Sequence, residues 1–146
     1  MSEGPAFEFV DDVTSDLSFV ARGATLPEVF RAAAEALLHA TLAAPEMLRA
    51  VERRRVELAE PDLELLLLRF LNELVYLRDA EALLLRPGEL QLEQTPAGDR
   101  LVVELAGERI DPARHVFLCE VKAATAHGLA VVAGPDGYRA TVTLDV

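Results

Sequence analysis

The sequence predicts a single domain of the α/β (α+β) class, in which two helices pack on a mixed β-sheet. Two stretches, residues 25–45 and 61–78, repeat apolar residues at the 3.6-residue spacing of amphipathic helices. Most of the remaining chain alternates apolar and polar residues between turns rich in Gly and Pro, which is typical of strands. The chain has 146 residues, 51% of them apolar, so we expect one domain, 1–146, with residues 1–6 flexible.

The first predicted helix, 25–45, begins with a complete start signal. Thr25 is placed to cap the helix, and Glu28 follows three residues later, which is the spacing of a capping box. Pro27 falls in the first turn, where its missing N–H costs little. Pro45 is expected to end the helix.

The second predicted helix, 61–78, carries an unusually wide apolar stripe. The stripe covers about half of the circumference, at ~100° per residue. Such a width indicates either a helix that is covered on several sides within a small protein, or a surface for a partner or a second copy of the chain. Leu65 and Tyr76 are predicted to project toward the polar side of this helix.

Strands are predicted on both sides of the helices. Two short strands lie within residues 7–23, one lies at 53–60, and about five follow residue 80. The predicted turns, loops and breaks after residue 80 are, in order, Pro87-Gly88, 96–99, 111–115, Gly128 and 134–137.

The charge of the chain limits its partners. The chain has 14 basic and 25 acidic residues, a net charge of −11. Tight binding of RNA through its phosphates requires clustered Lys and Arg and is therefore disfavoured. The acidic surface suits a metal cation, a basic protein partner or simple solubility.

The expected location is the cytoplasm. Cys119 is the only cysteine, so no intrachain disulfide forms, and a reducing compartment is the default. The first residues lack the basic and apolar regions of a signal peptide. No apolar run approaches the ~20 residues that span a bilayer, so no membrane partner is expected.

Nucleophilic catalysis has no support in the sequence. The serines Ser2, Ser15 and Ser18 do not stand in a nucleophile elbow. Cys119 follows His115 by four residues, but one Cys–His pair is too few ligands for zinc. We expect Cys119 to be a small core residue. Phosphate-loop and dinucleotide-binding motifs are absent.

Carboxylates remain as candidate functional groups. Asp11, Asp12 and Asp16 crowd one loop, but their spacing is not that of an EF-hand. Taken alone they indicate a solvated turn, or part of a site completed from elsewhere. Asp145 and Val146 end the last predicted strand. If that strand lies beside the first strands, Asp145 meets Asp16, and oxygens of Val146 add further hard ligands for a cation.

Five segments follow one another in a recognisable order. They are "DVTSD", "GATLPEVF", "DLELLLLRFLNELVYLRD", "EVKAATAHGLAV" and a final "LDV". In this order and spacing, from Phe7 to Val146, the chain resembles the archease family. Archeases are small proteins that assist the RtcB-type RNA ligase of tRNA splicing and RNA repair.

The resemblance implies a set of site residues. The second aspartate of the family's loop motif, its penultimate aspartate and its final residue touch a metal, which implies Asp16, Asp145 and Val146 as metal ligands here. Calcium is the first choice of cation, with magnesium or manganese as alternatives. Archease loops usually read Asp-His-Thr-Ala-Asp, whereas Val13 replaces the histidine in this chain.

Four further residues match positions of the family near this site. Asp12, Lys122, His127 and Glu73 are therefore predicted as supporting residues or partner contacts. Lys122 is placed to act as a counter-charge, to meet the ligase or its nucleotide, or to form a structural salt bridge. A capped or surface role is the alternative for His127.

The function that the resemblance implies is assistance without catalysis. Such a protein promotes the guanylylation of the ligase, which uses GTP and manganese, and allows repeated turnover. The partner is an RtcB-type ligase, with no tight RNA binding by this chain itself. Two other functions stay open: a chaperone-like interaction module that binds through the wide helix, and a metal-dependent phosphohydrolase that uses the same aspartates.

Overall fold

The computed structural model describes residues 6–10 and 16–146. The strands are β1 (Phe7–Val10), β2 (Asp16–Gly23), β3 (Glu52–Glu60), β4 (Leu83–Thr95), β5 (Gly98–Arg109), β6 (Ala123–Gly134) and β7 (Gly137–Asp145). The helices are α1 (Leu26–Thr41) and α2 (Leu63–Glu81), with a short 3₁₀ helix, η1 (Pro45–Met47), after α1.

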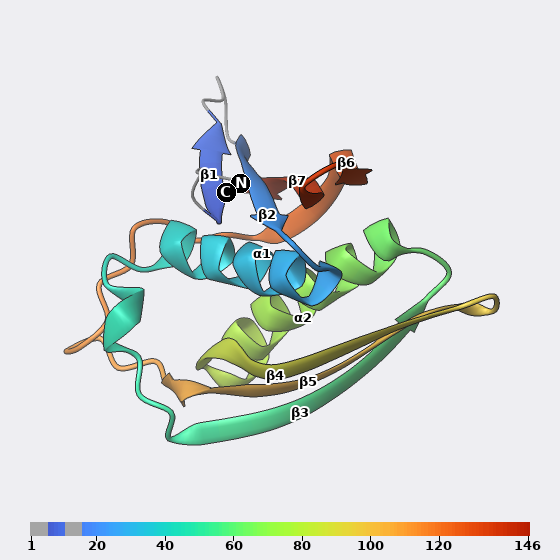
Figure 1. The fold of residues 1–146 in the computed structure, drawn as a ribbon. Coiled ribbons are helices and arrows are strands. Elements are labelled where there is room, and N and C mark those ends of the chain that lie inside the picture. The colour runs from blue at the N-terminus through green and yellow to red at the C-terminus, as the bar shows by residue number, and fades with distance from the viewer. Residues whose placement is uncertain (1–5, 11–15) are drawn as a thin grey trace.

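The strands form two sheets with the helices between them (Figure 1). One sheet has four strands in the order β1-β2-β7-β6, and the other has three in the order β3-β5-β4. A single core cluster draws buried residues from both sheets and both helices. The predicted class, two helices packed on β-sheet, is confirmed.

The arrangement of the strands differs from the single mixed sheet that the sequence analysis expected. Every strand pairing in the described part of the chain is antiparallel. The pairs β4–β5 and β6–β7 are joined by tight turns, and a tight turn can join only antiparallel strands. The sheets separate because each helix needs apolar cover on two sides.

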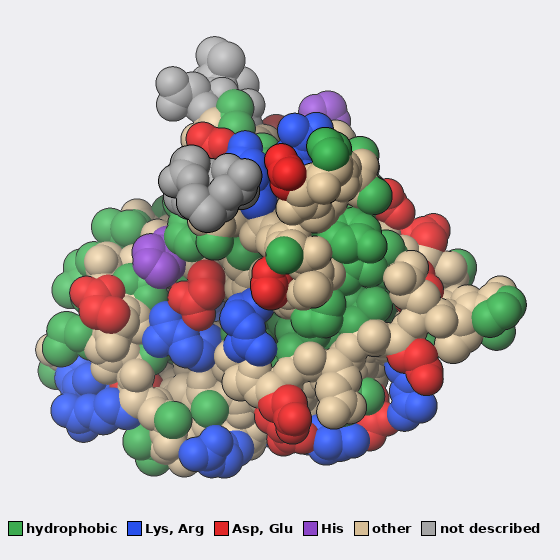
Figure 2. Space-filling model, viewed as in Figure 1, with side chains coloured by type: hydrophobic (Ala, Val, Ile, Leu, Met, Phe, Trp, Pro, Cys, Tyr) green, Lys and Arg blue, Asp and Glu red, His purple; other side chains and the backbone are tan. Residues whose placement is uncertain are grey.

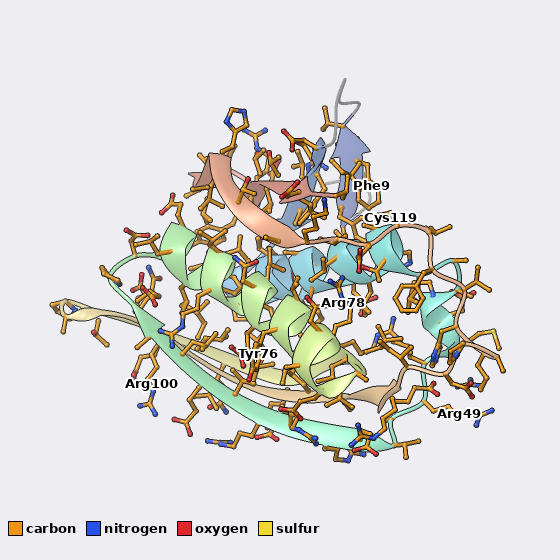
Figure 3. The ribbon with its side chains drawn as sticks, turned by 180° about the vertical axis from the view of Figure 1, so that it is seen from behind. Phe9, Arg49, Tyr76, Arg78, Arg100 and Cys119 are labelled. Atoms are coloured by element: carbon orange, nitrogen blue, oxygen red, sulfur yellow. The ribbon has the colours of Figure 1, made fainter. Side chains whose placement is uncertain are left out.

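The wide stripe of α2 is explained by its place in the middle layer. The helix contacts β6 on one side and β3, β4 and β5 on the other. The sequence analysis left two explanations open, and the covered helix accounts for the width of the stripe. Leu65 and Tyr76 are exposed, as predicted, and Figure 3 shows Tyr76 turned away from the core.

The start of α1 is confirmed, but its end is earlier than predicted. The backbone N–H of Glu28 donates to Thr25 Oγ1 at 3.3 Å, and the Glu28 carboxylate accepts from the N–H of Ala24 at 2.9 Å. The helix ends at Thr41, and Pro45 begins the separate helix η1. Apolar periodicity continued past the true end, so only the capping geometry could locate it.

The turn predicted at Pro87-Gly88 is wrong. Strand β4 runs through these residues, and its register with β5 shifts between Pro87 and Leu90. The strand lies at the edge of its sheet, where a proline without an N–H donor is tolerated at a bulge. The predicted five strands after residue 80 are therefore four. No helix in the described residues is long and apolar enough to cross a membrane.

Candidate cation site at the end of the last strand

The pairing of β2 with β7 brings Asp16 and Asp145 together. The two residues are directly opposite each other in the antiparallel register. The sequence analysis named this adjacency as the condition for a shared site, and the register meets it. Directly opposite residues have Cβ atoms about 4.5–5.5 Å apart, so the two carboxylates can reach one ion.

Both carboxylates lie on the face of the sheet that points away from the helices. Leu144, next to Asp145, is fully buried in the core, and side chains alternate between the faces of a strand. Two positions along the same outer face, Ser18 Oγ and Thr143 Oγ1 share a hydrogen bond of 2.9 Å. Asp16 and Asp145 are both half-buried.

The backbone around Asp145 is held from the other side by the start of β6. Ala123 lies opposite Asp145, and the N–H of Lys122 donates to the carbonyl oxygen of Asp145 at 2.7 Å. The side chain of Val146 packs against the main core. Since two neighbouring strands, β2 and β6, and a core contact fix this segment, its oxygen atoms have defined positions.

Two polar residues of α2 hold the start of β6 and the residue two positions before it, and the sequence analysis did not predict this role for either. Asn72 forms a pair of hydrogen bonds with the backbone of Ala124, at 3.0 and 2.8 Å. Arg78, which is 9% exposed, donates to the carbonyl oxygen of Val121 at 2.5 Å (Figure 3). An asparagine inside a strongly apolar helix indicates a side chain that binds a neighbouring backbone, because Asn is a poor helix former.

The charges around the pair leave room for a cation. Two carboxylates directly opposite each other repel, which destabilises the strand pairing unless a positive charge offsets it. Within residues 6–10 and 16–146, no basic side chain forms an ion pair with Asp16 or Asp145. The ammonium group of the exposed Lys122 forms no ion pair in this part of the chain either.

The other predicted supporting residues do not gather around the carboxylate pair in the described part of the chain. Asp12 lies outside the described residues. Glu73 is half-buried on α2, next to Asn72. His127 is exposed in an irregular segment of β6, where the register with β7 shifts between Thr125 and Ala130. The structure therefore does not join Glu73 or His127 to the carboxylate pair through a direct contact among the residues it describes.

The oxygen atoms around the carboxylate pair supply some, but not all, of the ligands that a hard cation needs. Calcium binds six to eight oxygen ligands, mainly carboxylates, carbonyls and water. The pair Asp16 and Asp145 supplies two carboxylates, and the following residue, Val146, supplies main-chain oxygen. Among the described residues, no three His, Cys, Asp or Glu side chains converge. A cation here would therefore need ligands from water, from Asp12 or from a partner.

The Cys–His pair is not a nucleophilic site. The Cys119 thiol donates to the carbonyl oxygen of Ala40 at 3.1 Å, and burial raises the pKa of this thiol. A raised pKa keeps the group as the unreactive thiol. His115 instead lies 3.4 Å from Glu108. Cys119 is half-buried and packs against the core, in agreement with its predicted structural role.

Comparison with known proteins gives consistent matches over nearly the whole chain. The model of the archease protein family matches residues 7–146. The archease of Pyrococcus abyssi is 37% identical over 124 residues, which are 85% of this chain and 87% of that protein. The archease of Methanosarcina mazei is 32% identical over 146 residues, covering 99% of both.

Two solved structures share the fold. Protein 1598 of Methanobacterium thermoautotrophicum superposes with a TM-score of 0.83 at 34% identity, covering 97% of this chain and 99% of that one. A Thermotoga maritima protein, described as an archease and possible chaperone, has a TM-score of 0.60 at 16% identity and covers 94% and 95%. At this low identity the second match supports the fold alone.

Proposed function

Because the chain belongs to the archease family, we propose that it is a non-catalytic activator of an RtcB-type RNA ligase in tRNA splicing and RNA repair. In this role it promotes guanylylation of the ligase and repeated turnover, and the ligase itself joins the RNA ends. The family membership supports an accessory protein, and the carboxylate pair supplies the group through which it acts.

One observation carries the proposal beyond the family membership. Asp16 and Asp145 are 129 positions apart in the sequence, yet β2 and β7 place them directly opposite each other on the outer face. Two opposed carboxylates without a basic partner are unfavourable for folding, so a functional reason for keeping them is expected.

A divalent cation gives that reason. The carboxylates of Asp16 and Asp145 and a main-chain oxygen of Val146 would hold it, with calcium as the first choice and magnesium or manganese as alternatives. A bound cation supplies the positive charge that lets both carboxylates stay ionised side by side. The main-chain bond from Lys122 and the bonds from Asn72 keep the ligand backbone in place.

The charge of the whole chain supports a basic partner. An enzyme that handles RNA needs a positive surface, and a protein with a net charge of −11 is attracted to such a surface. The attraction mainly raises the rate of encounter. The carboxylate pair then provides the specific contact.

A second candidate function, a chaperone-like module, is favoured by a different observation. The loop after His115 exposes three apolar side chains, Val116, Phe117 and Leu118, which are 66%, 40% and 61% exposed. Three adjacent exposed apolar side chains form a patch of the kind that marks an interaction site. Binding of unfolded proteins without a divalent cation, and loss of that binding in a Leu118→Ser variant, would favour this function.

A multiple-turnover RNA ligation assay tests the proposed function. The ligase from the same source is supplied with GTP and manganese, with and without this chain. We expect several products per ligase molecule only when the chain is present. Asp145→Asn and Asp16→Asn should abolish most of this stimulation while the circular dichroism spectrum stays unchanged.

The matched control is Glu93→Gln, which removes an exposed carboxylate from β4 in the other sheet. This variant should stimulate as well as the unchanged chain. Full stimulation by Asp145→Asn would refute the role of the carboxylate pair. Turnover of phosphoesters by the isolated chain, dependent on a divalent cation, would instead support the phosphohydrolase alternative.

A further inference from the structure

The opposite end of the β2–β7 ladder carries two arginines instead of two aspartates. Arg22 and Arg139 are directly opposite each other in the register. They stand an even number of positions from Asp16 and Asp145, so all four side chains belong to the outer face. Figure 2 shows Lys and Arg side chains, with acidic ones beside them, in the upper part of the view, where the sheet of β1, β2, β7 and β6 lies (Figure 1).

Both arginines line a hollow of about 670 Å³. Its other walls include Ala6, Val132, Tyr138 and the turn that joins β6 to β7. Binding sites for small organic molecules have volumes of roughly 300–1,000 Å³ and combine apolar walls with a few polar groups. The size and lining of the hollow therefore suit a small organic ligand.

The hydrogen bonds of Arg22 are incomplete. Its Nη2 forms an ion pair of 2.7 Å with Glu8 on the neighbouring strand β1, which holds the guanidinium in place. Its Nη1 is buried and has no hydrogen-bond acceptor among the described residues. A buried donor without an acceptor costs about 1–3 kcal/mol, and more when it is charged. Nη1 of Arg22 is therefore a hydrogen-bond donor that is held in place and lacks an acceptor in the described part of the chain.

Arg139 supplies a second donor that is free to turn into the hollow. Its side chain is exposed and forms no hydrogen bond or ion pair with the residues that the structure describes. Like charges directly opposite each other destabilise a strand pair. An anion that bridges Arg22 and Arg139 would offset this repulsion. It reaches Nη1 of Arg22, which is closed to solvent, once the guanidinium turns toward the hollow.

We propose that this hollow binds a phosphate group, carried by a free phosphate ion or by a small phosphate monoester, between Arg22 and Arg139. The planar guanidinium matches the spacing of phosphate oxygens and forms paired, charge-assisted hydrogen bonds with them. The exposed Val132, which lies opposite Arg139 on β6, gives an organic group of a monoester an apolar wall.

Two acidic residues oppose the binding of an anion: Glu8, which pairs with Arg22, and Asp136. Asp136 lies on the turn between β6 and β7 and also lines the hollow. Its negative charge repels a phosphate, so it weakens binding and restricts it to ligands that reach both arginines. Removal of this charge should consequently tighten the binding of phosphate.

The phosphate site is separate from the carboxylate pair. Arg22 lies six positions after Asp16 on β2, which corresponds to about 20 Å along the ladder. The inference does not depend on the proposed role in RNA ligation. Its test needs neither the ligase nor a divalent cation.

The test is an NMR titration of the whole chain at constant ionic strength, with inorganic phosphate, adenosine monophosphate and adenosine as probes. We expect phosphate and adenosine monophosphate to shift amide signals of residues 22–24 and 134–139, and adenosine alone to shift none. Saturation by phosphate with equal affinity would identify a free ion as the ligand. Tighter binding of adenosine monophosphate would identify a monoester.

Three variants make the test specific. Arg139→Gln should weaken binding about tenfold, equivalent to about 1.4 kcal/mol, and Asp136→Asn should strengthen it. Arg53→Gln, which removes an exposed arginine from β3 in the other sheet, is the matched control and should have no effect. The proposal is overturned if neither phosphate compound shifts these signals, or if Arg53→Gln weakens binding as much as Arg139→Gln.

Discussion

Two buried carboxylates, Asp99 and Glu108, have pKa values that move in opposite directions because their contacts differ. Burial raises the pKa of Asp99, and the nearby charges of Asp62 and Glu64 raise it further. Burial also acts to raise the pKa of Glu108, but the N–H of Arg49 at 2.7 Å and the ion pair with Arg114 outweigh it and lower that pKa. An ionised carboxylate therefore destabilises the fold at Asp99 and stabilises it at Glu108.

Asp99→Asn is expected to increase the free energy of unfolding at neutral pH. The folded-state pKa of Asp99 is raised, so its favourable contribution is fully present below the unfolded pKa and is lost as the pH rises through the folded pKa. The gain from Asn should therefore be small near about pH 4 and grow toward about pH 7. Urea unfolding of both proteins across this range measures it. A gain that is equal at every pH would contradict the assignment.

Glu108→Gln should have the opposite effect. The folded-state pKa of Glu108 is lowered, so its contribution is present above the unfolded pKa and disappears as the pH falls through the folded pKa. The variant should be less stable than the unchanged chain at neutral pH, and the difference should shrink on acidification. Thermal unfolding at several pH values tests this, with the exposed Glu93→Gln as a control that should show no such trend.

At the scale of the elements, β5 depends on a close approach between strands. Gly107 lies opposite Leu85 on β4, and a Cβ atom at this position would collide with the carbonyl oxygen of Leu84. The collision is with backbone, which cannot move without disturbing the ladder. Residues of β4 and β5 form the side of the core that packs against the helices. A displacement of these strands would therefore also disturb the packing of the helices.

Gly107→Ala is therefore expected to destabilise the fold by at least the ~1–3 kcal/mol that overpacking of a core costs. Guanidinium unfolding monitored by circular dichroism measures the change. Gly134→Ala is the matched control, since the nearest atom to its added Cβ would be 3.9 Å away. Equal stability of the two variants would show that β4 and β5 can separate at little cost.

The whole molecule has three layers and a strongly acidic charge. The helix α1 buries residues on nearly all of its sides, because a sheet lies above it and another below it (Figure 1). Most of the charges lie outside these layers, and many of them are paired, as in the contacts of Arg55 with Glu104 and of Arg100 with Glu57. Surface pairs of this kind contribute little to stability, so their main effect is on solubility and on encounters with partners.

The rate of association with the ligase should fall as salt is added. Attraction between a chain of net charge −11 and a basic enzyme acts at long range, and the Debye length shrinks from about 10 Å at 0.1 M salt to about 3 Å at 1 M. Stopped-flow association at increasing salt measures the rate. An association rate that does not change with salt would mean that the acidic surface serves solubility alone.

The features that the sequence alone determined are local. The capping of α1 by Thr25 and Glu28 depends on residues within one turn, and the apolar stripes of both helices depend on spacing along the chain. The order and spacing of the five segments were enough to predict the family. The structural role of Cys119 followed from the absence of a third catalytic or zinc-binding partner.

The tertiary structure alone decided how distant strands meet. Two sheets rather than one, and the passage of β4 through Pro87, depend on which surfaces need cover and on which strand lies at an edge. The register of β2 with β7 places Asp16 opposite Asp145 at one end and Arg22 opposite Arg139 at the other. Such pairings lie beyond local sequence patterns, because a strand carries no mark of its partner and one step of register moves every side chain to the other face.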